Sequence, residues 1–170
     1  MNTATEYGHY KSGVANSYSS REFANELKEI LPKSPKAFTY MLKLAFQNTF
    51  PFTEDEIHSV IDDIAVSIPT TKLQELLGDT DAAETVNITK PPLIATELHS
   101  YLDVHGIGIA MLLARHKYGD LSETDRNQTA ESESVISKQT GIFITEYSMQ
   151  GYVVKISTDL SLGAPIIELI

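Results

Sequence analysis

Apolar side chains recur every three or four positions along the first half of the chain, which is the spacing of one helix face. The first such run begins at Ser20 and ends at Pro32, because proline interrupts a helix. Its apolar positions are Phe23, Leu27, Ile30 and Leu31. We therefore predict a short helix between Ser20 and Pro32.

Two further runs carry signals for a helix start. Ser34 before Pro35 is typical of an N-cap residue followed by proline at the first helical position, and this helix should reach about Asn48. Thr53 and Glu56 form a capping box, in which a hydroxyl and a carboxylate each bind a backbone N–H that the helix leaves free. The apolar positions of the two predicted helices are Phe38, Met41, Leu42, Ala45 and Phe46, and then Ile57, Val60, Ile61, Ile64 and Ile68.

The pattern is less regular after Pro69. Residues 70–77 are typical of a short helix that ends before a glycine, and residues 86–89 of a short extended piece. Pro91 and Pro92 follow directly. This pair is the best candidate for a seam between two subdomains, because two consecutive prolines interrupt regular structure.

Three more helices are predicted beyond this seam. The first two cover residues 96–104 and 108–117, with Gly106 between them as a glycine that ends the first. Ser122 with Asp125 then gives a weaker capping signal, which predicts a third and more polar helix.

The period changes from helical to strand-like after Gly141. Residues 142–148 and 152–158 are rich in branched and aromatic side chains, and the short segment between them suits a hairpin turn. Residues 165–170 form a third run of the same kind. We therefore predict the α+β class, with an N-terminal helical bundle followed by helices and a C-terminal three-stranded antiparallel meander.

The same pattern divides the chain into three parts. Residues 1–19 lack periodicity and predict a flexible arm. A helical subdomain should occupy residues 20–90 and an α+β subdomain residues 91–170. The pattern leaves open whether the two subdomains share one core.

The net charge of the chain indicates which class of partner it can bind. The chain has 23 Asp and Glu residues against 13 Lys and Arg, and its formal net charge of -10 repels a phosphate backbone, which argues against direct binding of nucleic acid. Residues 54–84 hold nine of the acids and a single base, Lys72. A solvated helix surface would explain many of them, since acids in a first helical turn are favoured by the helix dipole. The alternative is a negative surface offered to a basic partner protein, formed by Asp55, Asp62, Asp63, Asp79, Asp81 and Glu84.

Other features of composition exclude some classes of protein. The chain has no cysteine, which excludes disulfides and thiolate chemistry. Its first residues lack the pattern of a secretory signal, and no run approaches the roughly 20 apolar residues of a membrane helix. We expect a cytoplasmic protein.

Candidate catalytic chemistry is concentrated between residues 99 and 125. The histidines and acids there are His99, Asp103, His105, His116, Asp120 and Asp125, and their spacing matches no common metal site. The chain also lacks a nucleophile elbow and both glycine-rich phosphate-binding motifs. Arg115 and His116 suit a helix end, where cationic side chains favour the dipole, and Asp120 could pair with either. We therefore predict a structural role for this stretch, with no catalytic residue, metal or cofactor.

From about Ile94 to the C-terminus the chain resembles a family of small plasmid- and phage-borne proteins, labelled as plasmid-related or as restriction-modification subunits. The family pattern joins an LLxRHxxGDWGD-like helix end to an ITEADRS-like segment. The matching residues here are Leu112, Leu113, Arg115, His116, Gly119, Asp120, Leu121 and Asp125, and then Tyr147, Gly151, Lys155, Ile156, Thr158, Asp159 and Ser161. The family's tryptophans are absent, its GDWGD box is shortened to Gly119-Asp120, and Leu160 replaces its arginine.

This resemblance implies an accessory protein of a mobile genetic element that acts against a host defence. Combined with the charge pattern, it predicts a non-enzymatic protein that covers a basic surface on a restriction or CRISPR-type protein. One alternative is an immunity or antitoxin protein that neutralises a basic toxin. The other is a metal-dependent hydrolase or nuclease that uses His116, Asp120 and Asp125.

Overall fold

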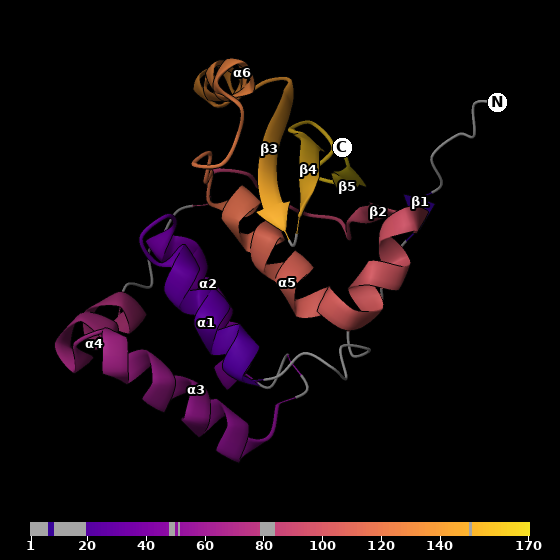
Figure 1. Cartoon of the computed structure of the whole chain (residues 1–170). Coiled ribbons are helices and arrows are strands. Elements are labelled where there is room, and N and C mark those ends of the chain that lie inside the picture. The colour runs from indigo at the N-terminus through magenta and orange to yellow at the C-terminus, as the bar shows by residue number, and fades with distance from the viewer. Residues whose placement is uncertain (1–6, 9–19, 48–49, 51, 79–83, 150) are drawn as a thin grey trace.

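The protein has an α+β fold, as predicted, in which a helical bundle and a mixed sheet lie on either side of one long helix (Figure 1). The computed structural model describes residues 7–8, 20–47, 50, 52–78, 84–149 and 151–170. The bundle is formed by α1 (Ser20–Ile30), α2 (Pro35–Phe46), α3 (Glu54–Ser67) and α4 (Thr70–Gly78).

The predicted helix-start signals are confirmed. Ser34 is the N-cap of α2, and its hydroxyl accepts a hydrogen bond from the backbone N–H of Ala37 at 3.3 Å. Thr53 and Glu56 form the predicted capping box at the start of α3, with distances of 3.2 Å and 3.0 Å. Each side chain satisfies a donor that would otherwise lack a partner within the helix.

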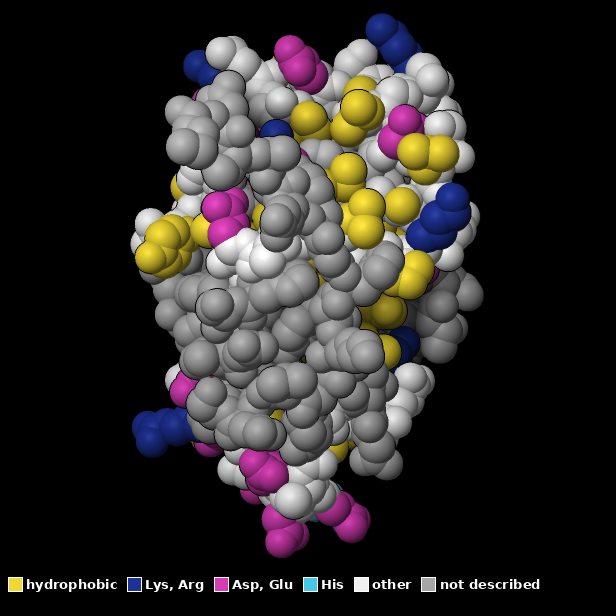
Figure 2. All heavy atoms as spheres, turned by 90° about the vertical axis from the view of Figure 1, so that its right-hand side faces the viewer, with side chains coloured by type: hydrophobic (Ala, Val, Ile, Leu, Met, Phe, Trp, Pro, Cys, Tyr) yellow, Lys and Arg dark blue, Asp and Glu magenta, His cyan; other side chains and the backbone are white. Residues whose placement is uncertain are grey.

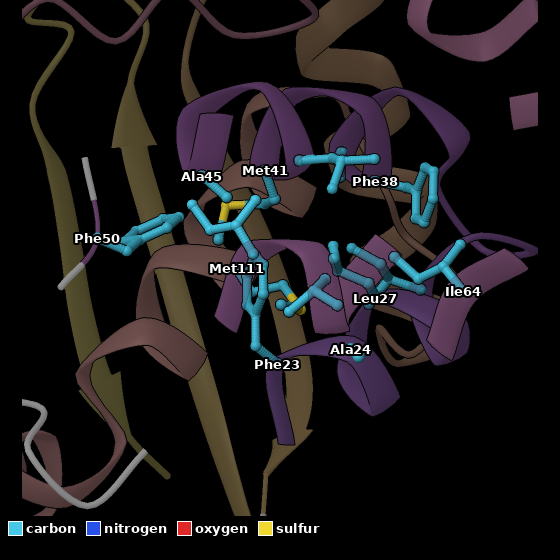
Figure 3. Close-up of a cluster of buried hydrophobic side chains, with 14 of the residues drawn as sticks. Phe23, Ala24, Leu27, Phe38, Met41, Ala45, Phe50, Ile64 and Met111 are labelled. Atoms are coloured by element: carbon cyan, nitrogen blue, oxygen red, sulfur yellow. The ribbon is translucent and has the colours of Figure 1, made fainter. Parts of the chain in front are cut away.

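The bundle buries an apolar cluster that includes one face of the long central helix (Figure 3). Phe23 and Leu27 of α1 and Phe38 of α2 are fully buried there, together with Ile64 of α3. Met111, from the central helix, packs into the same cluster. The stripes seen in the sequence are therefore the core of the bundle.

The sheet contains the predicted meander and two additional strands. Its order is β1-β2-β5-β4-β3, and the strands are β1 (Tyr7–Gly8), β2 (Leu93–Ala95), β3 (Ile142–Met149), β4 (Tyr152–Asp159) and β5 (Pro165–Leu169). The antiparallel pairs β3–β4 and β4–β5 confirm the meander. The prediction of a purely antiparallel sheet was wrong, because β2 pairs with β5 in parallel and β1 extends that side.

The central helix corrects a second prediction. A short 3-10 turn, Thr96–Leu98, leads into α5, which runs without interruption from His99 to Lys117. Gly106 therefore does not end a helix. A glycine inside a helix costs only about 1 kcal/mol, which tertiary contacts can outweigh. The α5 ribbon bends along its length (Figure 1), and glycine at positions 106 and 108 eases such bending.

The last helix, α6 (Arg126–Lys138), starts later than predicted. Its N-cap is Asp125, whose carboxylate accepts hydrogen bonds from the backbone N–H groups of Asn127 and Gln128 at 3.1 Å and 3.5 Å. Ser122 does not cap the helix, because its hydroxyl accepts a hydrogen bond from Arg115 and its backbone N–H binds Asp120.

Two apolar clusters meet along α5. Met111 and Ala114 belong to the bundle cluster, while Ile109 and Leu112 belong to a second cluster beneath the sheet. One side of α5 therefore packs into the bundle cluster, and another side packs into the cluster beneath the sheet. The division of the chain at Pro91 stays a prediction, and the arm predicted for residues 1–19 lies outside the described residues except for β1. Within the described residues, no helix has the length and apolar character needed to cross a membrane.

Candidate functional site

The family-like stretch at the end of α5 centres on a buried arginine. The Arg115 side chain is 4% exposed, and its Nε lies 2.6 Å from Asp120 Oδ2. Its Nη2 lies 2.5 Å from Glu123 Oε2. Burial acts to lower the pKa of Arg115, but the hydrogen bonds and charges of the two carboxylates outweigh it and raise that pKa. The guanidinium is therefore a fixed cation with its own counter-ions.

Tyr147 closes this cluster from the sheet side. Arg115 Cζ lies 4.4 Å from the centre of the Tyr147 ring, a cation–π contact. The Tyr147 hydroxyl donates a hydrogen bond of 2.7 Å to the backbone carbonyl of Asp120. Burial raises the pKa of this hydroxyl, so it remains a donor. The contacts join the end of α5 to β3.

The glycine of the family-like box has a steric role. Gly119 has φ of 73°, a conformation that favours glycine. A Cβ at this position would meet the Thr85 side chain at 2.8 Å. The turn that brings Asp120 back towards Arg115 therefore requires a residue without a side chain.

His116 points into the sheet and away from this cluster. It is fully buried, with Nδ1 2.7 Å from Thr145 Oγ1 on β3 and Nε2 2.8 Å from Thr158 Oγ1 on β4. Burial lowers the pKa of His116 to about 3. The imidazole is therefore neutral at pH 7, with one ring nitrogen donating to a threonine hydroxyl and the other accepting from one.

Side chains that follow the box cover the free edge of β3. Glu123 accepts from the backbone N–H of Ser148 at 3.2 Å, and Thr124 accepts from that of Glu146 at 3.1 Å. Further along, the Ser132 hydroxyl binds both backbone groups of Ile144, at 2.6 Å and 3.2 Å. Alternate edge groups of the strand are thus satisfied within the chain, which protects this edge from pairing with another strand.

The three residues of the hydrolase or nuclease alternative each make a different structural contact. His116 binds two threonines, Asp120 binds Arg115, and Asp125 caps α6. The other candidates, at positions 99, 103 and 105, lie in α5, where the structure describes the helix but not these side chains. Among the residues that the structure describes, no group of three or more His, Asp or Glu side chains could hold a metal ion.

A small pocket lies beside Arg115, between α1, α5 and β3. Its volume is about 180 Å³, and its lining residues are Glu26, Glu29, Ile30, Gly108, Met111, Leu112, Arg115 and Ser148. Sites for small organic ligands usually span roughly 300–1,000 Å³. This pocket is below that range, and its arginine is already bound to two carboxylates.

The predicted acidic surface is only partly available on α3. Asp55 and Asp62 are exposed and lie on one helix face, while Asp63 is half-buried. Glu84 is bound to Lys117, with Oε1 and Nζ 3.0 Å apart, so its charge is compensated within the chain. Asp79 and Asp81 lie outside the described residues.

An apolar groove lies beside this acidic face. It has a volume of about 350 Å³ and is lined by Phe46, Glu54, Ile57, His58 and Ile61. Phe46, at the end of α2, is 43% exposed, and the Glu54 side chain is 92% exposed with its carboxylate 3.9 Å from His58 Nε2. Sequence reasoning missed the groove, because Phe46 and Ile61 were assigned to the core with the other apolar positions. We call Asp55, Asp62 and these groove residues the α3 surface.

Replacing Arg115 should reveal the strength of its buried cluster. We expect Arg115→Gln to lower the free energy of unfolding by roughly 3 kcal/mol, because Asp120 would keep a buried charge without its cation. Urea denaturation measures this loss. The control is Arg126→Gln, at an exposed position on α6, which should change stability by less than about 0.5 kcal/mol. Equal effects of the two substitutions would contradict the structural role of Arg115.

The neutral state of His116 predicts a pH dependence of stability. Between pH 6.5 and about 3 the unfolded chain binds a proton at His116 that the folded protein does not bind. The stabilisation is therefore complete above pH 6.5 and is lost as the pH falls, by up to about 1.4 kcal/mol per pH unit. His116→Gln can still bind the threonines and should show a shallower slope in urea denaturation at several pH values. An unchanged slope would show that His116 is not the responsible group.

Comparison with known proteins yields no relative: no protein-family model, curated protein or solved structure matches this chain. The resemblance to the plasmid- and phage-borne family therefore stays a prediction.

Proposed function

We propose that the protein is a non-enzymatic binding protein that covers a basic surface of a partner protein with the α3 surface. The observation that carries this proposal is the position of exposed carboxylates directly beside an apolar groove. Asp55 and Asp62 supply charge, and Phe46 with Ile57 and Ile61 supplies the apolar contact. Interfaces commonly combine these two elements, with an anchor residue in a pocket and polar groups around it.

The charges would select the partner and speed its binding. A chain with a net charge of -10 attracts a basic surface at separations up to roughly the Debye length. This attraction raises the association rate more than it raises the affinity. Affinity would come from an apolar side chain of the partner that enters the groove. The partner surface that fits is therefore an exposed hydrophobic residue flanked by lysine or arginine.

The resemblance suggests which basic proteins to consider. Restriction and CRISPR-type defence proteins bind nucleic acid, so they expose basic surfaces of this kind. We propose that the chain belongs to a mobile genetic element and acts in the cytoplasm by occupying such a surface. Nucleic acid itself would be repelled by the same charges.

Charge reversal on α3 tests the proposal. The wild-type chain, immobilised and exposed to a lysate of the organism that encodes it, should capture a basic protein. We expect Asp55→Lys combined with Asp62→Lys to lose that protein, because the attractive charges become repulsive. The matched control is Glu131→Lys combined with Glu133→Lys, two exposed acids on α6, which should retain it. Capture by both variants alike, or capture of an acidic protein only, would contradict the proposal.

A substitution in the groove should affect the complex differently. With the captured protein purified, Phe46→Ala should raise the dissociation rate at least about fivefold and leave the association rate nearly unchanged, because it removes a contact without altering charge. Surface plasmon resonance separates the two rates. Leu162→Ala, at a loop residue that is 55% exposed, serves as the control for loss of an exposed apolar side chain. A wild-type dissociation rate for Phe46→Ala would exclude the groove from the interface.

A further inference from the structure

The outer face of the sheet carries partly exposed aliphatic side chains among charged and polar ones. Along β4, Val154 and Ile156 belong to the cluster beneath the sheet and Thr158 is buried on the same side, so the residues between them point the other way. On this outer face Val153 is 37% exposed and Ile142 is 51% exposed. Figure 2 shows hydrophobic side chains gathered together on the side of the molecule where β5 and β2 lie.

The strand register arranges the outer face in rows that run across the sheet. One row consists of Glu146 of β3, Lys155 of β4 and Glu168 of β5, in which Lys155 Nζ lies 3.9 Å from Glu168 Oε1. The next row is Ile144, Ser157, Ile166 and Leu93, from β3 to β2. On the other side of the charged row, Val153 binds the backbone N–H of Ile170, which is 62% exposed. The charged row thus lies between two rows that are mostly aliphatic.

We propose that this outer face binds a second copy of the chain, related by a two-fold axis that runs parallel to the strands between β4 and β5. Such a rotation exchanges β4 with β5 and β3 with β2. Within the middle row it places Lys155 of each copy opposite Glu168 of the other. In the flanking rows it places Val153 opposite Ile170, Ile144 opposite Leu93 and Ser157 opposite Ile166.

The charge pattern is the reason for choosing a second copy as the occupant. A two-fold interface uses the same patch on both subunits, so the patch must be complementary to itself. Lys155 and Glu168 have opposite sign and occupy neighbouring strands, so the rotation brings each to its counterpart. Glu146 lies outside this pair on β3, where its carboxylate accepts a hydrogen bond from the backbone N–H of Asp125. Two sheets can stack face to face at roughly 10 Å with their strands nearly aligned, as this axis requires.

The covered edge of β3 supports a face-to-face arrangement. Glu123, Thr124 and Ser132 already bind the backbone groups of that edge, so a second sheet cannot extend the first one there. The α3 surface lies in the bundle, on the other side of α5 from the sheet (Figure 1). The inferred dimer therefore does not depend on the proposed function.

Sedimentation velocity of the full chain over a range of concentrations tests this inference. We expect the wild-type chain to be a dimer at micromolar concentration and Val153→Asp to raise the dimer dissociation constant at least about tenfold, because it places a carboxylate in an aliphatic row. The matched control is Val66→Asp, at a residue of α3 that is 88% exposed, which should dimerise like the wild type. A monomeric wild-type chain at every concentration, or an unchanged Val153→Asp dimer, would overturn the proposal.

A charge exchange tests the position of the axis. Lys155→Glu alone and Glu168→Lys alone should each weaken the dimer, since like charges would then face each other. The two changes together restore opposite charges and should restore the wild-type dissociation constant. Failure of the double variant to dimerise, while circular dichroism shows native folding, would overturn the arrangement. Should Val153→Asp unfold, Ile170→Asp at the chain end provides the same readout, with the same expected loss.

Discussion

The guanidinium of Arg115 is a full positive charge that has almost no contact with water. Such a group is tolerated only when its counter-charges are held in place, and here Asp120 and Glu123 hold it from one side while the Tyr147 ring faces it from the other. The pairing sets the path of the chain after α5, because Gly119 must turn sharply for Asp120 to reach back.

The consequences extend along the sheet. Glu123 uses one carboxylate oxygen for Arg115 and the other for the edge of β3, so the same residue that balances the charge also covers the strand. Thr124 and Ser132 continue the cover. His116, the neighbour of Arg115, binds β3 and β4 through two threonines. Two adjacent side chains at the end of α5 therefore organise the loop, the edge and the underside of the sheet.

Local signals in the sequence were sufficient to predict where helices of the bundle begin. Ser34 with Pro35, and Thr53 with Glu56, act within a few residues of themselves, so their outcome does not depend on the rest of the fold. By contrast, β2 could not be predicted, because it is only three residues long and pairs in parallel with a strand far away in the chain. The helix end predicted at Gly106 was wrong because the free-energy cost of one glycine in a helix is small compared with the stabilisation that α5 gains by burying apolar side chains on both sides.

In the candidate site, too, the sequence predicted contacts between neighbouring residues but not contacts between residues far apart in the chain. The sequence predicted that Asp120 could pair with Arg115 or with His116, which are both close to it in the chain, and the structure shows the pair with Arg115. The contact between Tyr147 and Asp120 spans 27 residues and has no local signature. The groove beside α3 was hidden for a related reason: an apolar position at helical spacing indicates burial, and only the packing of α2 against its neighbours leaves Phe46 partly exposed.

We propose that the molecule presents α3 to a basic partner and uses the Arg115 cluster as support for its fold. Hydrogen–deuterium exchange of the chain, alone and bound to its captured partner, tests this claim most directly. We expect slower exchange in α3 and at the end of α2 around Phe46, with little change in residues 115–125. Protection confined to residues 115–125 or to the sheet, with α3 unchanged, would contradict it.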